Sequence, residues 1–230
     1  MIDVAMTPAE LAPADTVVVI DVLRATSTAT QALASGYRGV ICVDSTERAR
    51  ALRAPGRVLA GERRCLMPDG FDLGNSPLAV HDGADRELVL CTTNGAPAIV
   101  AAAKIAGEVM LACLLNLEAV AEAIGGDVQI VCAGTDGALA LEDVYAAGRL
   151  SALLSGERTD AALAAEAVAR AYPTAIEALS ASADARVLFA AGMADDITYC
   201  ALESALAVVP RVTSCGDDIA SVAAADTVAV

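Results

Sequence analysis

Thr-Val-Val-Val-Ile-Asp-Val-Leu-Arg-Ala-Thr-Ser-Thr-Ala-Thr, residues Thr16–Thr30, is the stretch that decides the fold. Its first part, Val17–Ile20, is a continuous β-branched run, which is typical of a strand buried on both faces of a sheet. Asp21 and Arg24 follow directly, and the hydroxyl side chains after them favour the start of a helix. In open α/β sheets, ligands bind at the carboxyl ends of strands, where helix N-termini attract anions. The stretch therefore predicts a strand–turn–helix unit with a polar ligand site at its turn.

The same pattern of an apolar strand, a polar turn and a helix recurs twice, at Leu88–Ile99 and Val128–Leu141. The two turns are Thr92-Thr93-Asn94-Gly95 and Gly134-Thr135-Asp136-Gly137. Both are able to present backbone N–H groups to a phosphate. If the three strands neighbour one another, their turns converge on one site.

The rest of the chain extends this alternation. Strands are expected at Val40–Val43, Arg57–Ala60, Glu87–Cys91, Glu108–Cys113 and Asp127–Cys132, with helices at Glu47–Arg53, Pro97–Ile105, Leu117–Ile124 and Ala140–Leu154. The last third predicts short helices that mainly cover the sheet, with an edge strand at Val208–Val212, where a proline is tolerated. No Pro/Ser/Gly-rich linker divides the chain. We therefore expect a three-layer α/β/α fold, with a mixed, mostly parallel sheet flanked by helices, as one domain over residues 1–230.

One long segment, Gly61–Pro77, breaks the alternation. Loops of this length inside compact domains are usually functional or disordered, and the apolar residues Met67, Phe71 and Leu73 favour an ordered, functional loop. Four carboxylates are expected at the site, and two of them, Glu62 and Asp72, lie in this loop. The other two are Glu142 and Asp143. Oxygen-only ligands of this kind favour Mg²⁺. Acids in the first turn of a helix also stabilise the helix itself, so the last two have a structural explanation as well.

Three arginines are candidates for binding an anion: Arg24, Arg63 and Arg64. The guanidinium group matches carboxylate, sulfonate and phosphate oxygens with two hydrogen bonds. Neither polar turn continues as a P-loop or as a dinucleotide-binding fingerprint. The sequence therefore favours a small anionic ligand over a nucleotide.

Composition narrows the class of partner. The formal net charge is −15, which argues against binding to nucleic acid or to an anionic membrane surface. The seven cysteines include no Cys-x-x-Cys pair and there is one histidine, so buried free thiols in a reducing compartment explain them better than a zinc site. Residues Met1–Asp15 lack the pattern of a signal peptide, and no apolar run is long enough to span a bilayer. We expect a cytoplasmic protein, and a homo-oligomer is compatible with the sequence.

Several segments together resemble the 2-phosphosulfolactate phosphatase family. They are Asp21–Thr28, Gly61-Glu62-Arg63, Gly70-Phe71-Asp72-Leu73-Gly74-Asn75-Ser76-Pro77, Thr92–Gly95, and Cys132-Ala133-Gly134 followed by Glu142-Asp143, with a weaker match around Asp195-Asp196-Ile197. The resemblance implies a hydrolase, a Mg²⁺-dependent phosphatase that converts 2-phospho-3-sulfolactate to 3-sulfolactate and phosphate. In methanogens this is a step of coenzyme M biosynthesis.

The resemblance also implies roles for individual residues. Asp21, with one or more of Glu62, Asp72, Glu142 and Asp143, is expected to hold Mg²⁺. The catalytic set is expected to be Asp21, Arg24, Glu62 and Arg63, with the two arginines on the anionic groups of the substrate. Substrate-orienting groups are expected at Asn75, Ser76, Thr92, Thr93, Asn94, Gly95 and Gly134. Attack on phosphorus by water and attack by a carboxylate both remain open.

Two positions depart from the family's pattern. Cys65 and Ala96 stand where Gly and Thr are usual, and both could alter the fit of the substrate without removing the metal. Two alternative functions also remain. One is a phosphatase for another small 2-phospho-hydroxy acid, and the other is a non-catalytic anion-binding protein. The carboxylates argue against the second, because acids beside an anion are unfavourable unless a cation bridges them.

Overall fold

The strand β2 (Thr16–Ile20) lies in the interior of the sheet, and all of its side chains are buried. The structure is a computed structural model, and residues 1–225 are described. Val17 and Val19 belong to one core cluster, while Val18 and Ile20 belong to a second cluster on the opposite face of the sheet. The β-branched run therefore forms the doubly buried strand that it predicts.

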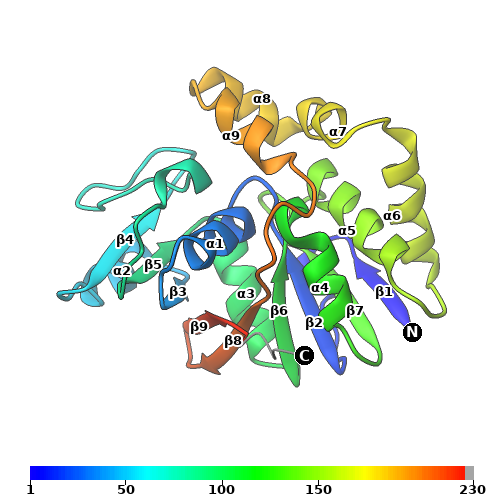
Figure 1. Ribbon diagram of the computed structural model, residues 1–230, viewed down its shortest axis with the longest axis horizontal. Helices are drawn as coiled ribbons and strands as arrows, with labels where there is room; N and C mark the ends of the chain where they lie inside the picture. Colours follow the sequence, from blue (N-terminus) through cyan, green and yellow to red (C-terminus); the bar gives the residue numbers. More distant parts are fainter. Residues whose placement is uncertain (226–230) are drawn as a thin grey trace.

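Within residues 1–225, nine strands form one sheet in the order β1-β7-β2-β6-β8-β9-β3-β5-β4 (Figure 1). The strands are β1 (Ile2–Ala5), β2, β3 (Gly39–Val43), β4 (Arg57–Gly61), β5 (Glu87–Cys91), β6 (Glu108–Ala112), β7 (Val128–Cys132), β8 (Pro210–Cys215) and β9 (Ile219–Ala224). β1, β7, β2 and β6 pair in parallel, and so do β3, β5 and β4. The sheet thus consists of two parallel blocks.

The hairpin β8–β9 joins these two blocks, and both of its outer pairings are antiparallel. β8 meets β6 through the single register pair Met110–Arg211, whereas β9 pairs with β3 over four residues, Val40–Val43. The expectation of an edge strand at residues 208–212 was therefore wrong, because β8 lies inside the sheet. Pro210 is tolerated there because it is the first residue of the strand, where a missing N–H costs least.

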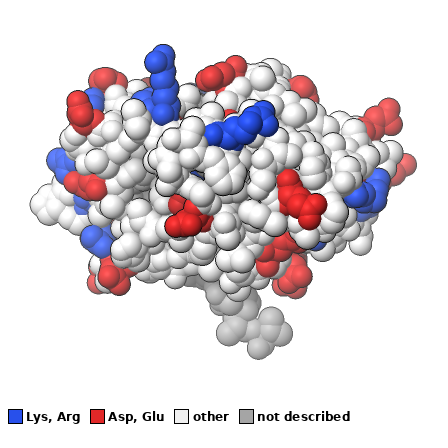
Figure 2. Space-filling view, turned by 90° about the horizontal axis from the view of Figure 1, so that it is seen from above, with Lys and Arg blue, Asp and Glu red and all other residues white. Residues whose placement is uncertain are grey.

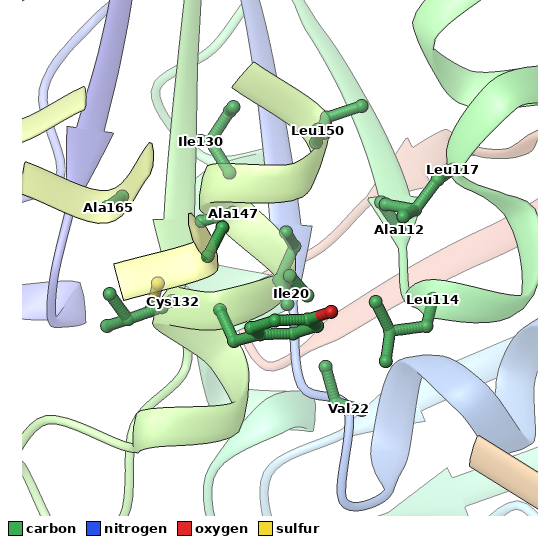
Figure 3. Packing of buried hydrophobic residues seen from close by; sticks show 14 of the residues in the cluster. Ile20, Val22, Ala112, Leu114, Leu117, Ile130, Cys132, Ala147, Leu150 and Ala165 are labelled. Atoms are coloured by element: carbon green, nitrogen blue, oxygen red, sulfur yellow. The ribbon is translucent and has the colours of Figure 1, made fainter. Parts of the chain in front are cut away.

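Helices cover both faces of the sheet, as the three-layer prediction requires. The helices are α1 (Ala25–Ala34), α2 (Thr46–Ala51), α3 (Gly95–Ala103), α4 (Leu117–Ala123), α5 (Leu141–Leu153), α6 (Asp160–Ala171), α7 (Ala175–Ala181), α8 (Ala183–Ala190) and α9 (Ala194–Cys200), with 3₁₀ turns at Pro8–Glu10, Pro77–Ala79 and Leu114–Asn116. α1 and α3 pack on one face, and α4, α5 and α6 pack on the other. Figure 3 shows the second core, which includes Ile20, Val22, Leu114 and Ile130. Asp21, which lies between Ile20 and Val22, is thereby held by a packed core.

The turns after β2, β5 and β7 converge, although the three strands are not all neighbours. β7 pairs with β2, but β6, β8, β9 and β3 separate β5 from β2. Convergence at β5 depends instead on α3, whose first residue, Gly95, lies against Asp21 and Ala25. The expected result is confirmed, but helix packing produces it rather than strand adjacency.

The helices α7, α8 and α9 lie beyond the carboxyl ends of the central strands (Figure 1). Ala185 and Leu188 of α8 and Ile197 of α9 pack onto the core beneath them. The prediction that this part of the chain mainly covers the sheet was incomplete, because α8 and α9 also carry Asp184 and Asp196 to the site described below. In residues 1–225, no helix is both long enough and apolar enough to cross a membrane.

Candidate active site

A cavity of about 260 Å³ opens at the carboxyl edge of the sheet, where these turns meet α8. Its walls come from the turn after β2, the loop after β4, the turns after β5 and β7, and α8. The lining residues are Asp21, Leu23, Arg24, Glu62, Arg64, Cys65, Asn75, Thr92, Thr93, Asn94, Thr135, Asp136, Asp184, Val187 and Leu188. Half of the fourteen residues expected at the site from the sequence, seven of them, therefore line one cavity, and the others are described below.

Asp21 lies at the base of this cavity and is almost fully buried. Its Oδ1 accepts a hydrogen bond of 2.9 Å from the backbone N–H of Ala25, the first residue of α1. Its other oxygen faces Gly95, where a Cβ would collide with Oδ2 of Asp21 and with the side chain of Ala25. Gly95 is therefore required because the chain after β5 passes so close to this carboxylate.

Burial raises the pKa of Asp21 from its ordinary value to about 7, and the nearby carboxylates of Asp184 and Glu62 act in the same direction. The hydrogen bond from Ala25 and the charge of Arg24 lower the pKa, but each effect is weaker than that of burial. Near neutral pH this carboxyl group is therefore only partly ionised. A bound cation would favour its ionised form.

Glu62 joins the loop after β4 to the turn after β5. One carboxylate oxygen accepts hydrogen bonds of 2.8 Å from both the N–H and the hydroxyl of Thr93, and the other accepts one of 3.0 Å from the N–H of Cys65. The neighbouring Gly61 passes so close to the carbonyl of Cys91 that no Cβ would fit. Glu62 thus both lines the cavity and holds two of its walls together.

The hydroxyl of Thr92 and the side-chain amide of Asn94 also act within the turns themselves. Thr92 Oγ1 accepts a hydrogen bond of 2.9 Å from the N–H of Ala96, in the first turn of α3. Asn94 Oδ1 accepts one of 3.1 Å from the N–H of Asp136, which links the turn after β5 to the turn after β7. These contacts fix the turns around the cavity.

Arg24 is buried and paired with Asp196 of α9. Its guanidinium donates to Asp196 at 2.5 Å and also contacts the sulfur of Met193 at 3.0 Å. The hydroxyl of Ser76 donates to the other oxygen of Asp196 at 2.6 Å. Arg24 lines the cavity with its charge already compensated. Ser76 is not among the lining residues, and its hydroxyl holds Asp196.

Arg63 supports the loop after β4 and does not line the cavity. Its guanidinium donates to the carbonyls of Glu62 at 2.8 Å and Asp44 at 3.1 Å, and to the sulfur of Cys91 at 3.1 Å. These acceptors anchor the start of the loop to the ends of neighbouring strands. The hydrogen bonds of Arg63 hold the loop in place, so they do not support the direct contact with substrate that was expected of this arginine.

Asp143 fastens the end of β2 to the end of β7. Its two oxygens accept hydrogen bonds from the N–H of Val22 at 2.8 Å and the N–H of Gly134 at 3.0 Å. The amide of Gly134, expected to face the substrate, is thus committed to Asp143. Burial, followed by the charges of Asp21 and Glu142, raises the pKa of Asp143 well above its ordinary value.

Glu142 lies behind the cavity wall, beside Asp184. Burial and the charge of Asp184 raise the pKa of Glu142 to about 8. Asp184 itself lines the cavity and accepts a hydrogen bond of 2.5 Å from the hydroxyl of Thr135. Asp184 is a site residue that the sequence did not reveal, since an acid in the first turn of a helix is ordinarily explained by the helix dipole.

Asp72 is the one expected metal ligand that the structure places on a separate contact network. Its carboxylate accepts a hydrogen bond of 2.8 Å from the N–H of Leu59 in β4 and pairs with the half-exposed Arg53 at 3.2 Å. It does not line the cavity. Its position in the family-like motif reflects attachment of the loop to β4.

The cavity suits a hard cation. Asn75 is buried and lines the cavity, and its Oδ1 has no hydrogen-bond partner. A buried acceptor without a donor, beside crowded carboxylates, is an arrangement that a cation would satisfy. In the described part of the chain no three His, Cys, Asp or Glu side chains are grouped to hold a metal alone. Mg²⁺ does not need such a group, because it relies on one or two carboxylates together with waters and substrate oxygens.

An acid-lined cavity at the carboxyl edge of a mostly parallel sheet defines an α/β protein with a site for a small polar ligand. A family model described as 2-phosphosulpholactate phosphatase matches residues 3–214. The chain belongs to the 2-phosphosulfolactate phosphatase family, a family of phosphoric monoester hydrolases, and the resemblance of its motifs is confirmed.

Curated relatives agree along most of their length. A protein of Thermus thermophilus is 43% identical over 210 residues, covering 87% of this chain and 89% of the relative. One from Deinococcus radiodurans is 41% identical, covering 89% and 90%, and one from Thermotoga maritima is 38% identical, covering 93% and 96%. Each is named a probable 2-phosphosulfolactate phosphatase.

Proposed function

We propose that this protein hydrolyses 2-phospho-3-sulfolactate to 3-sulfolactate and phosphate in the cavity around Asp21, with Mg²⁺ as its cofactor. Family membership over residues 3–214 supports the reaction. The observation that carries the proposal for the site is the position of Asp21, a buried carboxylate that directly follows β2 and lines an acid-lined cavity.

Side-chain oxygens of the lining residues Asp21 and Asn75, together with those of Glu62 or Asp184, would hold the cation. When bound, Mg²⁺ polarises a phosphoryl group and lowers the pKa of an attacking water. Asp143 and Glu142 serve this site from behind: Asp143 fixes the ends of β2 and β7, and Glu142 lies against Asp184. Asp72 has no part in it.

The phosphoryl group would bind between the start of α1 and the Thr92–Asn94 turn, which leads into α3. N-terminal ends of helices favour anions because their first N–H groups point outward. Arg24 faces the same space, and its pairing with Asp196 keeps the guanidinium fixed before substrate arrives. A fixed donor stabilises charge that develops in the transition state without having to reorganise.

Phosphate release from a panel of esters tests the proposal. The purified protein is assayed on 2-phospho-3-sulfolactate, 2-phospholactate and 2-phosphoglycerate, with Mg²⁺ and then with EDTA. We expect the highest kcat/KM for the sulfonated ester and loss of turnover in EDTA that returns when Mg²⁺ is restored. A preference for another ester would reassign the substrate. Binding of these acids in EDTA, with no turnover of any ester, would instead identify an anion-binding protein.

A further inference from the structure

Two cationic side chains line the cavity, Arg24 and Arg64, and their situations differ. Arg24 is buried and paired with Asp196 at 2.5 Å. Arg64 is exposed, and no residue in the described part of the chain forms an ion pair or a hydrogen bond with its side chain. Arg64 therefore stands at the mouth of the cavity with its guanidinium free to bind a ligand.

The backbone holds Arg64 there in a conformation that side-chain-bearing residues rarely adopt. Arg63 and Leu66 exchange backbone hydrogen bonds of 2.9 and 3.1 Å, which close a tight turn. The two residues between them have φ values of 53° at Arg64 and 64° at Cys65. Two successive positive φ values define a turn that favours Asn and Gly. Glu62 stabilises this turn by accepting the N–H of Cys65.

The charges around the cavity explain why a free arginine matters. Four carboxylates line it, those of Asp21, Glu62, Asp136 and Asp184. The whole chain carries a formal net charge of −15, and on the face shown in Figure 2 acidic and basic side chains are interspersed without a continuous basic area among the described residues. A substrate with an acid group beside its phosphate therefore needs a second local cation, in addition to the one proposed at Asp21.

We propose that Arg64 is a specificity-determining residue that binds the second anionic group of the substrate, a carboxylate or a sulfonate, while the phosphoryl group lies at Asp21. This inference rests on the proposed phosphatase function. The guanidinium group donates two parallel hydrogen bonds to either kind of oxyanion, so one residue accounts for recognition of both. Its place at the mouth fits a small substrate whose phosphate enters first.

The test compares Arg64→Ala and Arg64→Lys with Arg38→Ala. Arg38 precedes β3 at the opposite end of the strands, and its replacement removes the same charge from an exposed surface. The substrates are 2-phospho-3-sulfolactate, 2-phospholactate, which keeps only the carboxylate, and 2-propyl phosphate, which has neither acid group. We expect Arg64→Ala to raise KM about tenfold or more for the esters that carry the acid group bound by Arg64, which include 2-phospho-3-sulfolactate in either case. The loss for them should exceed the loss for 2-propyl phosphate by a similar factor, and Lys should restore part of it.

Comparing 2-phospho-3-sulfolactate with 2-phospholactate shows which of the two acid groups Arg64 binds. If Arg64→Ala raises KM much more for the sulfonated ester than for 2-phospholactate, Arg64 binds the sulfonate. If KM rises equally for the two esters, Arg64 binds the carboxylate. Equal losses for all three esters, or no loss in Arg64→Ala relative to Arg38→Ala, would overturn the inference.

A binding measurement separates this inference from the proposed function. Calorimetric titration with 3-sulfolactate and with inorganic phosphate needs no turnover. We expect Arg64→Ala to weaken binding of 3-sulfolactate about tenfold and to affect phosphate much less. If the wild-type protein hydrolyses none of the esters but this difference holds, the phosphatase proposal fails and the role of Arg64 stands. Failure of the wild-type protein to bind 3-sulfolactate would overturn the role of Arg64.

Discussion

Gly95 lies so close to the carboxylate of Asp21 that no side-chain carbon fits between them. The contact joins the start of α3, from one parallel block of the sheet, to the end of β2, from the other. A glycine that looks from the sequence like ordinary turn chemistry is thus a steric requirement of the site.

Gly95→Ala should displace Asp21 or the start of α3. Overpacking of this kind costs about 1–3 kcal/mol, and we expect a lower Tm together with a loss of turnover larger than that loss of stability explains. Gly125→Ala is the matched control, because Gly125 has open space around it and lies outside the cavity. Thermal unfolding and phosphate release measure the two effects, and a Gly95→Ala enzyme with normal activity would contradict this account.

Asp21→Asn and Asp143→Asn should separate chemistry from architecture. Asp21→Asn removes a buried carboxylate whose pKa is raised to about 7, so the fold should be kept or slightly stabilised while phosphate release is lost. Asp143→Asn places an N–H₂ group against the N–H of Val22 or of Gly134, which leaves a buried donor unpaired at a cost of about 1–3 kcal/mol. Urea unfolding together with the phosphate assay distinguishes them. Similar stabilities for the two variants would disprove the structural role of Asp143.

Arg24→Met should destabilise the fold because Asp196 would remain buried without its partner. Breaking one side of a buried ion pair typically costs about 3–5 kcal/mol. The double variant Arg24→Met with Asp196→Leu removes both charges and should regain most of that stability, but not activity. Recovery of turnover in the double variant would remove Arg24 from the site.

The acid cluster predicts how stability depends on pH. In EDTA, the folded protein holds protons on Asp21 up to about pH 7 and on Glu142 up to about pH 8, whereas the unfolded chain releases them near pH 4. The folded state therefore binds more protons between these values, and its stability should fall as pH rises from 5 to 8. Thermal unfolding across this range measures the slope, which should be smaller in Asp21→Asn. A stability that rises over the range would contradict the assignment.

Adding Mg²⁺ should oppose this trend. A cation bound to ionised carboxylates stabilises the folded state more at pH 8 than at pH 5, because the ligands must lose their protons to bind. The gain in Tm on adding Mg²⁺ should therefore increase with pH. Equal gains at both pH values, or equal gains in wild type and Asp21→Asn, would place the ion elsewhere.

The fold was largely predictable where the local pattern carries the information. β5 has the predicted bounds Glu87–Cys91, and β2 differs by one residue, because apolar runs bounded by polar turns depend little on distant partners. β1 and β9 were not foreseen. In β1 Asp3 interrupts the apolar run that identified the other strands, and β9 is placed by antiparallel pairing with β3, far away in the sequence.

The site was predictable where polar residues directly follow such strands, as at Asp21 and at the turn after β5. Asp184 was missed, and Asp196 was given no role although its segment resembles the family, because each occupies the first turn of a helix, a position that needs no function to explain an acid. Asp72 shows the converse. Its motif resembles the family's, but its partners, Leu59 and Arg53, are those of a residue that fastens a loop to a strand.

The hairpin β8–β9 has a consequence for the order in which the molecule is made. Every residue that lines the cavity comes earlier in the chain than this hairpin. The cavity walls belong to two parallel blocks that the hairpin alone connects within the described sheet. During synthesis on the ribosome, the residues of the site therefore emerge while the sheet is still in two parts. The residues that line the cavity are therefore synthesised first, and the two strands that join the parallel blocks carrying them are synthesised last.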